Sequence, residues 1–197
     1  MVQRLYVYVM KEHDNRKSLL RAASKLFRQR GYAGVGISDI LAATNLPKGS
    51  LYYHFPGGKQ QLAEEATRLA DDAVVRMIET SFVGAGSFSE GSVAFCRAIA
   101  RLSSADGGFF ACPVMSIIQA GEEVPSLHKT GWRILAGWTE RVRAHAVRLG
   151  QPAPGEAAAL LVIQIEGAWT VAIAQRSIAP FQLLERALSR SQSGGIG

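Results

Sequence analysis

Five side chains between residues 48 and 54 have the chemistry needed to contact a nucleic acid. They are Lys48, Ser50, Tyr52, Tyr53 and His54. Lysine, serine and the backbone amides of a helix N-terminus bind phosphate oxygens, while hydroxyl and aromatic groups reach base edges or thymine methyl groups in a major groove. The alternative is a solvated amphipathic helix that carries two tyrosines, because a short motif stays a hypothesis until its context agrees.

The spacing of the neighbouring apolar residues predicts a helix with one buried and one exposed face. Leu51 and Phe55 lie four residues apart and should face inward, whereas Lys48 and Tyr52, also four apart, should share the outward face. Pro47 fits the start of this helix, since a proline lacks the N–H that a first turn leaves unpaired.

A second short helix is expected just before this one. Ser38 is a good N-cap and Asp39 places a carboxylate at the positive end of the helix dipole, so the helix should begin at about Ser38. Asn45 tolerates a left-handed backbone, and residues 44–47 can therefore stop the helix and turn the chain sharply. The pattern predicts two short helices joined by a tight turn.

Longer helices are expected on both sides of this pair. Residues 14–30 have helical apolar spacing with one basic flank and should brace the pair, with Gly31 as the C-cap. A helix from about Lys59 to Ile78 or Phe82 should connect the pair to a second core, with an inner stripe that includes Leu62, Ala66, Leu69 and Ala73.

Residues 22–62, and above all the run from Lys48 to Phe55, resemble the DNA-binding region of the TetR family of transcriptional regulators. The resemblance covers about the first third of the chain. It implies base contacts from Tyr52 and mainly phosphate contacts from the other residues of the predicted DNA surface. These residues are Lys48, Gly49, Ser50, Tyr53, His54 and Lys59.

One further feature extends this resemblance, and two others depart from the family pattern. The run from Ala111 to Val114 is similar to a subgroup that contains multidrug- and flavonoid-responsive repressors. Pro47 stands where the family usually has Ser or Thr, and Pro56-Gly57-Gly58 is one residue longer than the equivalent turn in most members.

The charge distribution agrees with a nucleic-acid partner for the N-terminal part. Residues 1–60 carry ten Lys or Arg and three Asp or Glu, a net charge of +7, whereas the whole chain has +6. The basic excess therefore lies in the segment that contains the helix pair, as an electrostatic footprint on phosphates requires.

Cysteine and histidine usage points to neither a disulfide framework nor a metal site. Cys96 and Cys112 both lie in apolar surroundings, and the four histidines are scattered without ligand spacing. We expect a reduced, cytoplasmic protein with no metal and no cofactor.

Neither the N-terminal residues nor the most apolar stretch carries a clear targeting or membrane signal. Residues 1–10 lack a signal-peptide pattern and are expected to be a frayed tail; the alternatives are a groove-binding arm through Arg4 or a segment preceding a natural start at Met10. Gln164 and Glu166 interrupt the apolar stretch near residue 160, so no membrane span is expected.

The chain as a whole is predicted to be all-α, because no strand pattern, internal repeat or glycine-rich phosphate loop occurs in it. Residues 1–57 should form an N-terminal arm and a three-helix helix-turn-helix DNA-binding domain, and residues 58–197 a larger helical ligand-binding and dimerisation domain. The helix at about residues 156–177 is apolar around most of its circumference and must be covered on more than one side. We therefore expect a homodimer through this helix and the last one, at about residues 181–191.

The larger domain is predicted to hold a mostly apolar, aromatic-lined pocket for a small hydrophobic or aromatic ligand, although aromatic residues at helical spacing also fill ordinary cores. Eight residues are predicted to line this pocket. They are Phe110, Met115, Gln119, His128, Trp132, Trp138, Gln164 and Trp169.

The functional interpretation is a non-enzymatic, ligand-responsive regulator that binds double-stranded operator DNA, and the family resemblance implies that it is a repressor. An all-helical enzyme that uses Cys112 as a nucleophile or Glu166 as a base stays open. An interaction module with a degenerate DNA-binding head also stays open, since Pro47 departs from the family pattern. Salt-dependent binding to duplex DNA would separate the first interpretation from both others.

Overall fold

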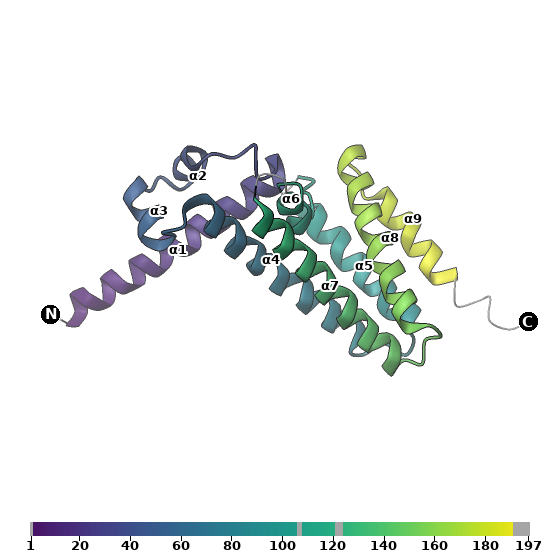
Figure 1. Ribbon diagram of the computed structural model, residues 1–197. Helices are drawn as coiled ribbons and strands as arrows, with labels where there is room; N and C mark the ends of the chain where they lie inside the picture. The colour runs from purple at the N-terminus through teal and green to yellow at the C-terminus, as the bar shows by residue number, and fades with distance from the viewer. Residues whose placement is uncertain (1, 106–107, 121–123, 191–197) are drawn as a thin grey trace, which may run out of the picture. The chain divides into compact units, whose positions relative to one another are not determined.

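The computed structural model describes residues 2–105, 108–120 and 124–190. Over these ranges the chain forms α-helices and no strand, which confirms the all-α prediction (Figure 1). Its packing divides into two compact units. The first lies within residues 1–70 and 113–131, and the second within residues 71–112 and 132–197. The predicted domain limits, 1–57 and 58–197, stay a prediction.

Helix α1 begins earlier than the apolar pattern indicated. It spans Val2–Arg30 rather than starting at about Asp14, so the expected frayed tail is helical from Val2 onward. No glycine or proline interrupts the chain before Gly31, and nothing in the backbone therefore stops the helix from extending. The side chain of Arg4 lies outside the described part of the structure.

The two short helices form as predicted, with a different cap on the first. Helix α2 spans Ile37–Thr44 and α3 spans Lys48–His54. The N-cap of α2 is Gly36 rather than Ser38, because the Asp39 carboxylate accepts a hydrogen bond from the Gly36 N–H at 2.7 Å and stabilises an earlier start. Asn45 has φ 52° and ψ 34°, which confirms the left-handed turn.

The first unit has one apolar core to which α1 and both short helices contribute. Helix α1 packs against α2, α3 and α6, and α6 spans Pro113–Ile118. The beginnings of α4, which spans Gly58–Phe82, and of α7, which spans Pro125–Arg148, complete this unit. The large buried side chains of the core include Leu19, Phe27, Ile40, Leu51, Phe55, Leu62, Ile117 and Leu127.

The buried stripe of α4 differs at two positions from the predicted one, because Leu69 is exposed and Ala73 is only half-buried. Leu62 and Ala66 are buried as expected, but Leu69 is 48% exposed. The buried row continues at a spacing of four through Val74 and Ile78, and Leu69 falls beside that row.

The second unit is a helical bundle in which α5, α8 and α9 pack against one another (Figure 1). Helix α5 spans Phe88–Ser103, and its N-cap is Ser87, whose hydroxyl accepts a hydrogen bond from the Glu90 N–H at 3.1 Å. Helices α8 and α9 span Pro154–Gln175 and Ala179–Arg190. Ser191, the last residue of the predicted dimer helices, lies outside the described residues.

Helix α8 is apolar on more sides than its neighbours cover. One row of its side chains is buried, including Leu161, Ile165 and Trp169, while Ile163 is 64% exposed. Among the helices of the described ranges it alone is long and apolar enough to cross a membrane, which is weak evidence because core helices of soluble proteins pass the same test.

A carboxyl group is buried inside this second unit. The Oε2 atom of Glu166 on α8 is inaccessible and has no hydrogen-bond partner, while the carboxyl group accepts a hydrogen bond from the Cys112 thiol. Burial raises the pKa of the Glu166 carboxyl from 4.5 to about 7, and the Cys112 contact lowers it by less. The folded chain therefore holds a proton on Glu166 in a pH range where the unfolded chain has released it.

We predict that this carboxyl group makes stability fall as pH rises between about 4.5 and about 7. Because the folded pKa is raised, the folded state binds the extra proton across that window, and ionising the buried group costs about 3 kcal/mol above it. Wild type should lose about this much free energy of unfolding relative to Glu166→Gln between pH 5 and pH 8. Thermal and urea unfolding at fixed protein concentration measure the difference.

Glu156→Gln is the matched control, because it removes an exposed carboxylate from the first turn of the same helix. Parallel stability curves for wild type and Glu166→Gln across this pH range would contradict the prediction.

Candidate nucleic-acid interface

Helix α3 is held in the first unit by two side chains and presents the rest outward. Leu51 and Phe55 are fully buried, as their spacing predicted. Tyr52 and Tyr53 are 41% and 66% exposed, which is unusual for large aromatic side chains. The helix therefore offers polar aromatic groups to a partner while its anchors lie in the core.

The outward side chains of α3 contact one another along the helix. The Lys48 ammonium lies 5.8 Å from the centroid of the Tyr52 ring, so these two residues share one face. Ser50 and His54 are half-buried, and the His54 ring meets the Tyr53 ring edge-on at 5.0 Å. The surface of α3 therefore carries two contacting pairs, Lys48 with Tyr52 and Tyr53 with His54.

Gly49 lies on this exposed surface with open space around it. A Cβ atom at this position would meet nothing within 4 Å, and the residue does not have a positive φ. A glycine inside a helix costs up to about 1 kcal/mol relative to alanine, and no contact within the described chain accounts for it. Close approach of an external backbone is one physical reason for a glycine at such a place.

The turn between α3 and α4 accommodates its additional residue through two glycines. Gly58 has φ +63°, and its N–H donates to the Phe55 carbonyl oxygen at 2.8 Å. Just beyond it, the Lys59 ammonium lies 4.0 Å from the centroid of the buried Tyr32 ring. A contact between Lys59 and phosphate would therefore compete with this cation–π interaction.

The basic residues of α1 are used in two different ways. Lys17, Arg21 and Lys25 are exposed and follow one face at a spacing of four, which leaves them available to a polyanion. Arg16 is instead directed to the Phe55 ring, with its Cζ atom 5.2 Å from the ring centroid, and to the Glu65 carboxylate. From the sequence, Arg16 is one of several basic residues on the exposed flank of α1. Only the tertiary structure shows its contacts with Phe55 and Glu65.

Residues 19–66 match the model of the bacterial regulatory proteins of the tetR family. This stretch contains α2, the turn at Asn45 and α3, and it includes the N-terminal part of the core of the first unit, from Leu19 to Ala66. The N-terminal region, residues 19–66, belongs to the TetR family. Helices α2 and α3 are its helix-turn-helix, and the subgroup suggested by the run at residues 111–114 stays a prediction.

Individual proteins support this membership over different lengths. The transcriptional regulator LmrA of Bacillus subtilis is 42% identical over 43% of this chain and 45% of its own length, so the match spans less than half of that relative. A TetR transcriptional regulator from Chloroflexus aurantiacus has a TM-score of 0.80 at 25% identity, covering 94% of this chain and 97% of that structure.

A third comparison concerns a structure that contains DNA. A cysteine mutant of the TetR family regulator CifR, complexed with a 26-base-pair double-strand operator, has a TM-score of 0.79 at 20% identity. It covers 88% of this chain and 94% of that one, and at this identity the similarity shows the shared fold.

The residues predicted to line a ligand pocket fall in both units of the chain. Met115, Gln119 and His128 belong to the first unit, and the other five belong to the second. Gln119 and His128 are exposed. The prediction that all eight share one pocket stays a prediction.

Within the second unit the aromatic residues have different surroundings. The Trp169 indole N–H donates to the Phe110 carbonyl oxygen at 2.7 Å, and both side chains are buried. The buried Trp138 donates to the Asp71 carboxylate at 2.7 Å, whereas Trp132, expected on the inner side of its helix, is 64% exposed. Of the four aromatic residues predicted to line the pocket, Trp132 therefore has the ring least suited to an apolar lining.

The groups proposed for alternative chemistry are closed to a substrate. Cys112 is 3% exposed, and its hydrogen-bond partner Glu166 is half-buried with one inaccessible carboxyl oxygen. Burial raises the pKa of the Cys96 thiol to about 12, which keeps that group protonated and unreactive. In the described ranges, no group of three or more His, Cys, Asp or Glu residues could hold a metal ion.

Proposed function

We propose that this protein is a ligand-responsive transcriptional repressor that binds operator DNA through α3 and leaves it when a small hydrophobic or aromatic molecule binds. The observation that carries the proposal is the outward face of α3, where Lys48, Tyr52 and Tyr53 are exposed while Leu51 and Phe55 anchor the helix. This arrangement suits a helix that enters a major groove.

Three further observations support DNA as the partner. The basic excess lies in residues 1–60, which contain the helix-turn-helix. The open space at Gly49 leaves room for a phosphate backbone to approach. The structurally similar regulator CifR has been crystallised with double-strand operator DNA. In this proposal Tyr52 contacts bases, and Lys48, Gly49, Ser50, Tyr53, His54 and Lys59 mainly contact phosphates.

The proposed regulator is a cytoplasmic homodimer that pairs through α8 and α9 as a four-helix bundle. Five large apolar side chains of this region are between 39% and 64% exposed, namely Leu160, Ile163, Val171, Ile178 and Leu183. A groove of about 630 Å³ runs between the two helices, and Gln164 is part of its lining. An apolar surface of this kind is rarely left open on a monomer, and a two-fold pair would place two α3 helices in successive major grooves about 34 Å apart.

The ligand site in this proposal lies in the second unit, around the buried aromatic residues Phe110, Trp138 and Trp169. The remaining residues of the predicted lining are secondary to it, because Trp132 is exposed and Gln164 lines the groove that a second subunit would cover. Ligand binding weakens DNA binding only to the extent that the ligand prefers the conformation that cannot bind DNA.

An enzymatic function has less support. Its candidate groups, Cys112 and Glu166, contact each other, but Cys112 is only 3% exposed and one carboxyl oxygen of Glu166 is inaccessible. The named relatives are regulators. No observation favours a catalytic reaction over DNA binding.

The first prediction of this proposal concerns the operator contacts. Tyr52→Ala should cost about 1–3 kcal/mol of operator affinity and relax sequence preference, because Tyr52 contacts bases. Lys48→Ala should weaken binding to all duplexes and make the salt dependence shallower, because it removes a phosphate contact. Fluorescence anisotropy over a salt series measures both, and unchanged operator affinity in a Lys48/Tyr52/Tyr53 triple alanine variant would refute the interface.

The second concerns the dimer. Leu183→Glu places a charge on the apolar groove between α8 and α9, so it should convert the dimer to a folded monomer and lower operator affinity. Gln182→Glu is the matched control, since Gln182 is exposed on α9 outside the groove. Sedimentation equilibrium gives the oligomeric state. A wild-type monomer that still binds operator at micromolar concentration is incompatible with the proposed assembly.

The third concerns the ligand. Planar hydrophobic compounds that bind near Trp169 should quench its fluorescence and release operator DNA in the same concentration range. A Trp132→Phe background removes the exposed indole, so that the emission reports the two buried tryptophans. Compounds that bind equally well with and without operator would show that the site exists without the proposed coupling.

A further inference from the structure

The turn that follows α3 is held by a side chain from the first turn of α4. The Gly57 N–H donates to the Gln61 Oε1 atom at 2.8 Å. Backbone N–H groups before and at the start of a helix have no partner within it, and Gln61 supplies one. A Cβ atom on Gly57 would lie 3.0 Å from the Gln61 Cβ, so this turn and this side chain fit closely.

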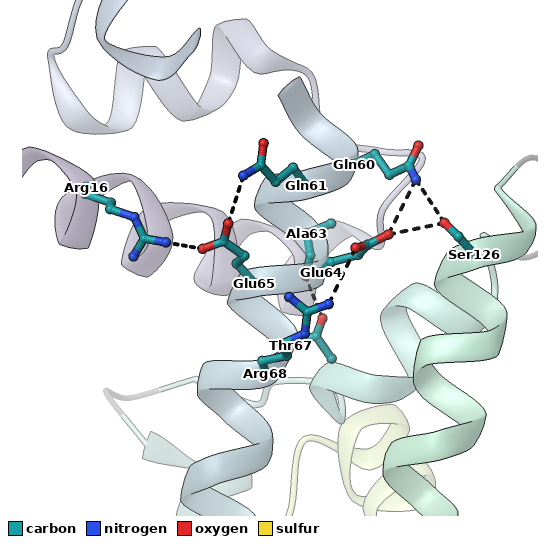
Figure 2. A network of polar contacts seen from close by, with 9 residues as sticks. All are labelled: Arg16, Gln60, Gln61, Ala63, Glu64, Glu65, Thr67, Arg68 and Ser126. Carbon is teal, nitrogen blue, oxygen red and sulfur yellow. Dashed lines mark hydrogen bonds and ion pairs between the residues drawn. The ribbon is translucent and has the colours of Figure 1, made fainter. Parts of the chain in front are cut away.

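The same glutamine continues the chain of contacts along α4. Its Nε2 atom donates to the Glu65 Oε1 atom at 3.0 Å, one helical turn further on (Figure 2). Gln61 therefore uses its oxygen toward the turn and its nitrogen toward Glu65, and one amide orientation satisfies both bonds. The side chain joins the turn to a carboxylate.

The carboxylate of Glu65 connects α4 to α1. Its Oε2 atom forms an ion pair with the Arg16 guanidinium, and Figure 2 shows Arg16 reaching toward Glu65 from α1. The Glu65 side chain is 19% exposed and that of Arg16 is 40% exposed, so the pair is partly shielded from water. An ion pair with these properties restrains both helices more than a fully exposed one would.

Arg16 closes the circuit at the end of α3. Its Cζ atom lies 5.2 Å from the centroid of the Phe55 ring, and the Phe55 N–H donates to the Leu51 carbonyl oxygen at 2.8 Å. The series of contacts that starts at Gly57, just after α3, therefore ends at Phe55, the C-cap of α3. We call this circuit the α3 clamp and define it by Arg16, Phe55, Gly57, Gln61 and Glu65.

We propose that the α3 clamp positions α3 for sequence-specific DNA binding, so that Gln61 and Glu65 determine operator selectivity without touching DNA. This inference rests on the proposed function. A carboxylate next to phosphates would oppose binding, yet Glu65 is directed to α1 and to Gln61. Base contacts require a helix placed within about 0.5 Å, whereas phosphate contacts by long basic side chains tolerate more freedom.

The neighbouring residue on α4 provides a matched control. Glu64 accepts a hydrogen bond from the Ser126 hydroxyl on α7 at 3.2 Å and pairs with Arg68 at 3.7 Å (Figure 2). Replacing Glu64 or Glu65 by Gln makes the same change of charge on the same helix. Only the second change breaks the clamp.

The experiment measures the affinity of the full-length chain for two duplexes of equal length over a salt series. One is an operator that wild type selects from a random duplex pool, and the other is its scrambled sequence. Glu65→Gln should lower the ratio of the two affinities roughly tenfold, the effect of losing about one base contact. The salt dependence should not become shallower, because every lysine and arginine is retained.

Gln61→Glu is the second variant, since it places a carboxylate against Glu65 and removes the nitrogen donor that joins them. It should lower selectivity in the same way, while Glu64→Gln should keep the wild-type ratio. Arg16→Gln combined with Glu65→Gln should cost little more selectivity than either change alone, because both break one circuit. Thermal unfolding of each variant shows whether it is folded.

The outcomes distinguish the clamp from the proposed function. If wild type selects no duplex, DNA binding itself is wrong and the clamp inference falls with it. If wild type selects an operator and folded Glu65→Gln and Gln61→Glu variants keep its selectivity, the proposed function stands and the clamp is refuted. An equal loss of selectivity in Glu64→Gln would also refute it, since general changes of charge on α4 would then explain the effect.

Discussion

The burial of Leu51 and Phe55 is the constraint on which the DNA-facing surface depends. Helix α3 has seven residues, too few to be stable alone in water, so its conformation comes from packing against the core of the first unit. Both anchors are fully buried, which determines the direction of the intervening residues. The exposed tyrosines are therefore a consequence of where the apolar residues go, and the helix can carry a polar, reactive surface without losing its position.

The second unit illustrates a different balance between burial and exposure. It encloses a carboxyl group at Glu166 that has one unpartnered oxygen, and it leaves apolar side chains of α8 and α9 exposed. Each feature is unfavourable in an isolated, rigid monomer. A second subunit would cover the exposed apolar side chains. Protonation removes the charge from the Glu166 carboxyl group below about pH 7. The composition of α8 thus fits core packing on one side and the proposed association on the other.

Much of this architecture could be predicted from local patterns. The four-residue spacing of Leu51 and Phe55 predicts that both are buried, and Asn45 predicts a left-handed turn. A proline suits the first turn of a helix, which is where Pro113 lies in α6. Helix limits were less predictable where a side chain competed with the simplest cap, as Asp39 did by capping from inside α2. The start of α1 was also misplaced, because the weak apolar pattern before residue 14 does not stop a helix that contains neither glycine nor proline.

The sequence by itself determined the all-α class, the helix-turn-helix and the face of α3 that carries Lys48 and Tyr52, since these depend on the helical period and on residue types within a few positions. Tertiary structure decided which distant residues meet. It turned Arg16 from a basic flank toward Phe55 and Glu65, exposed Trp132, and placed Cys112 against a buried Glu166. Such contacts join helices far apart in the chain, and no local period encodes which side chains their packing brings within hydrogen-bonding distance.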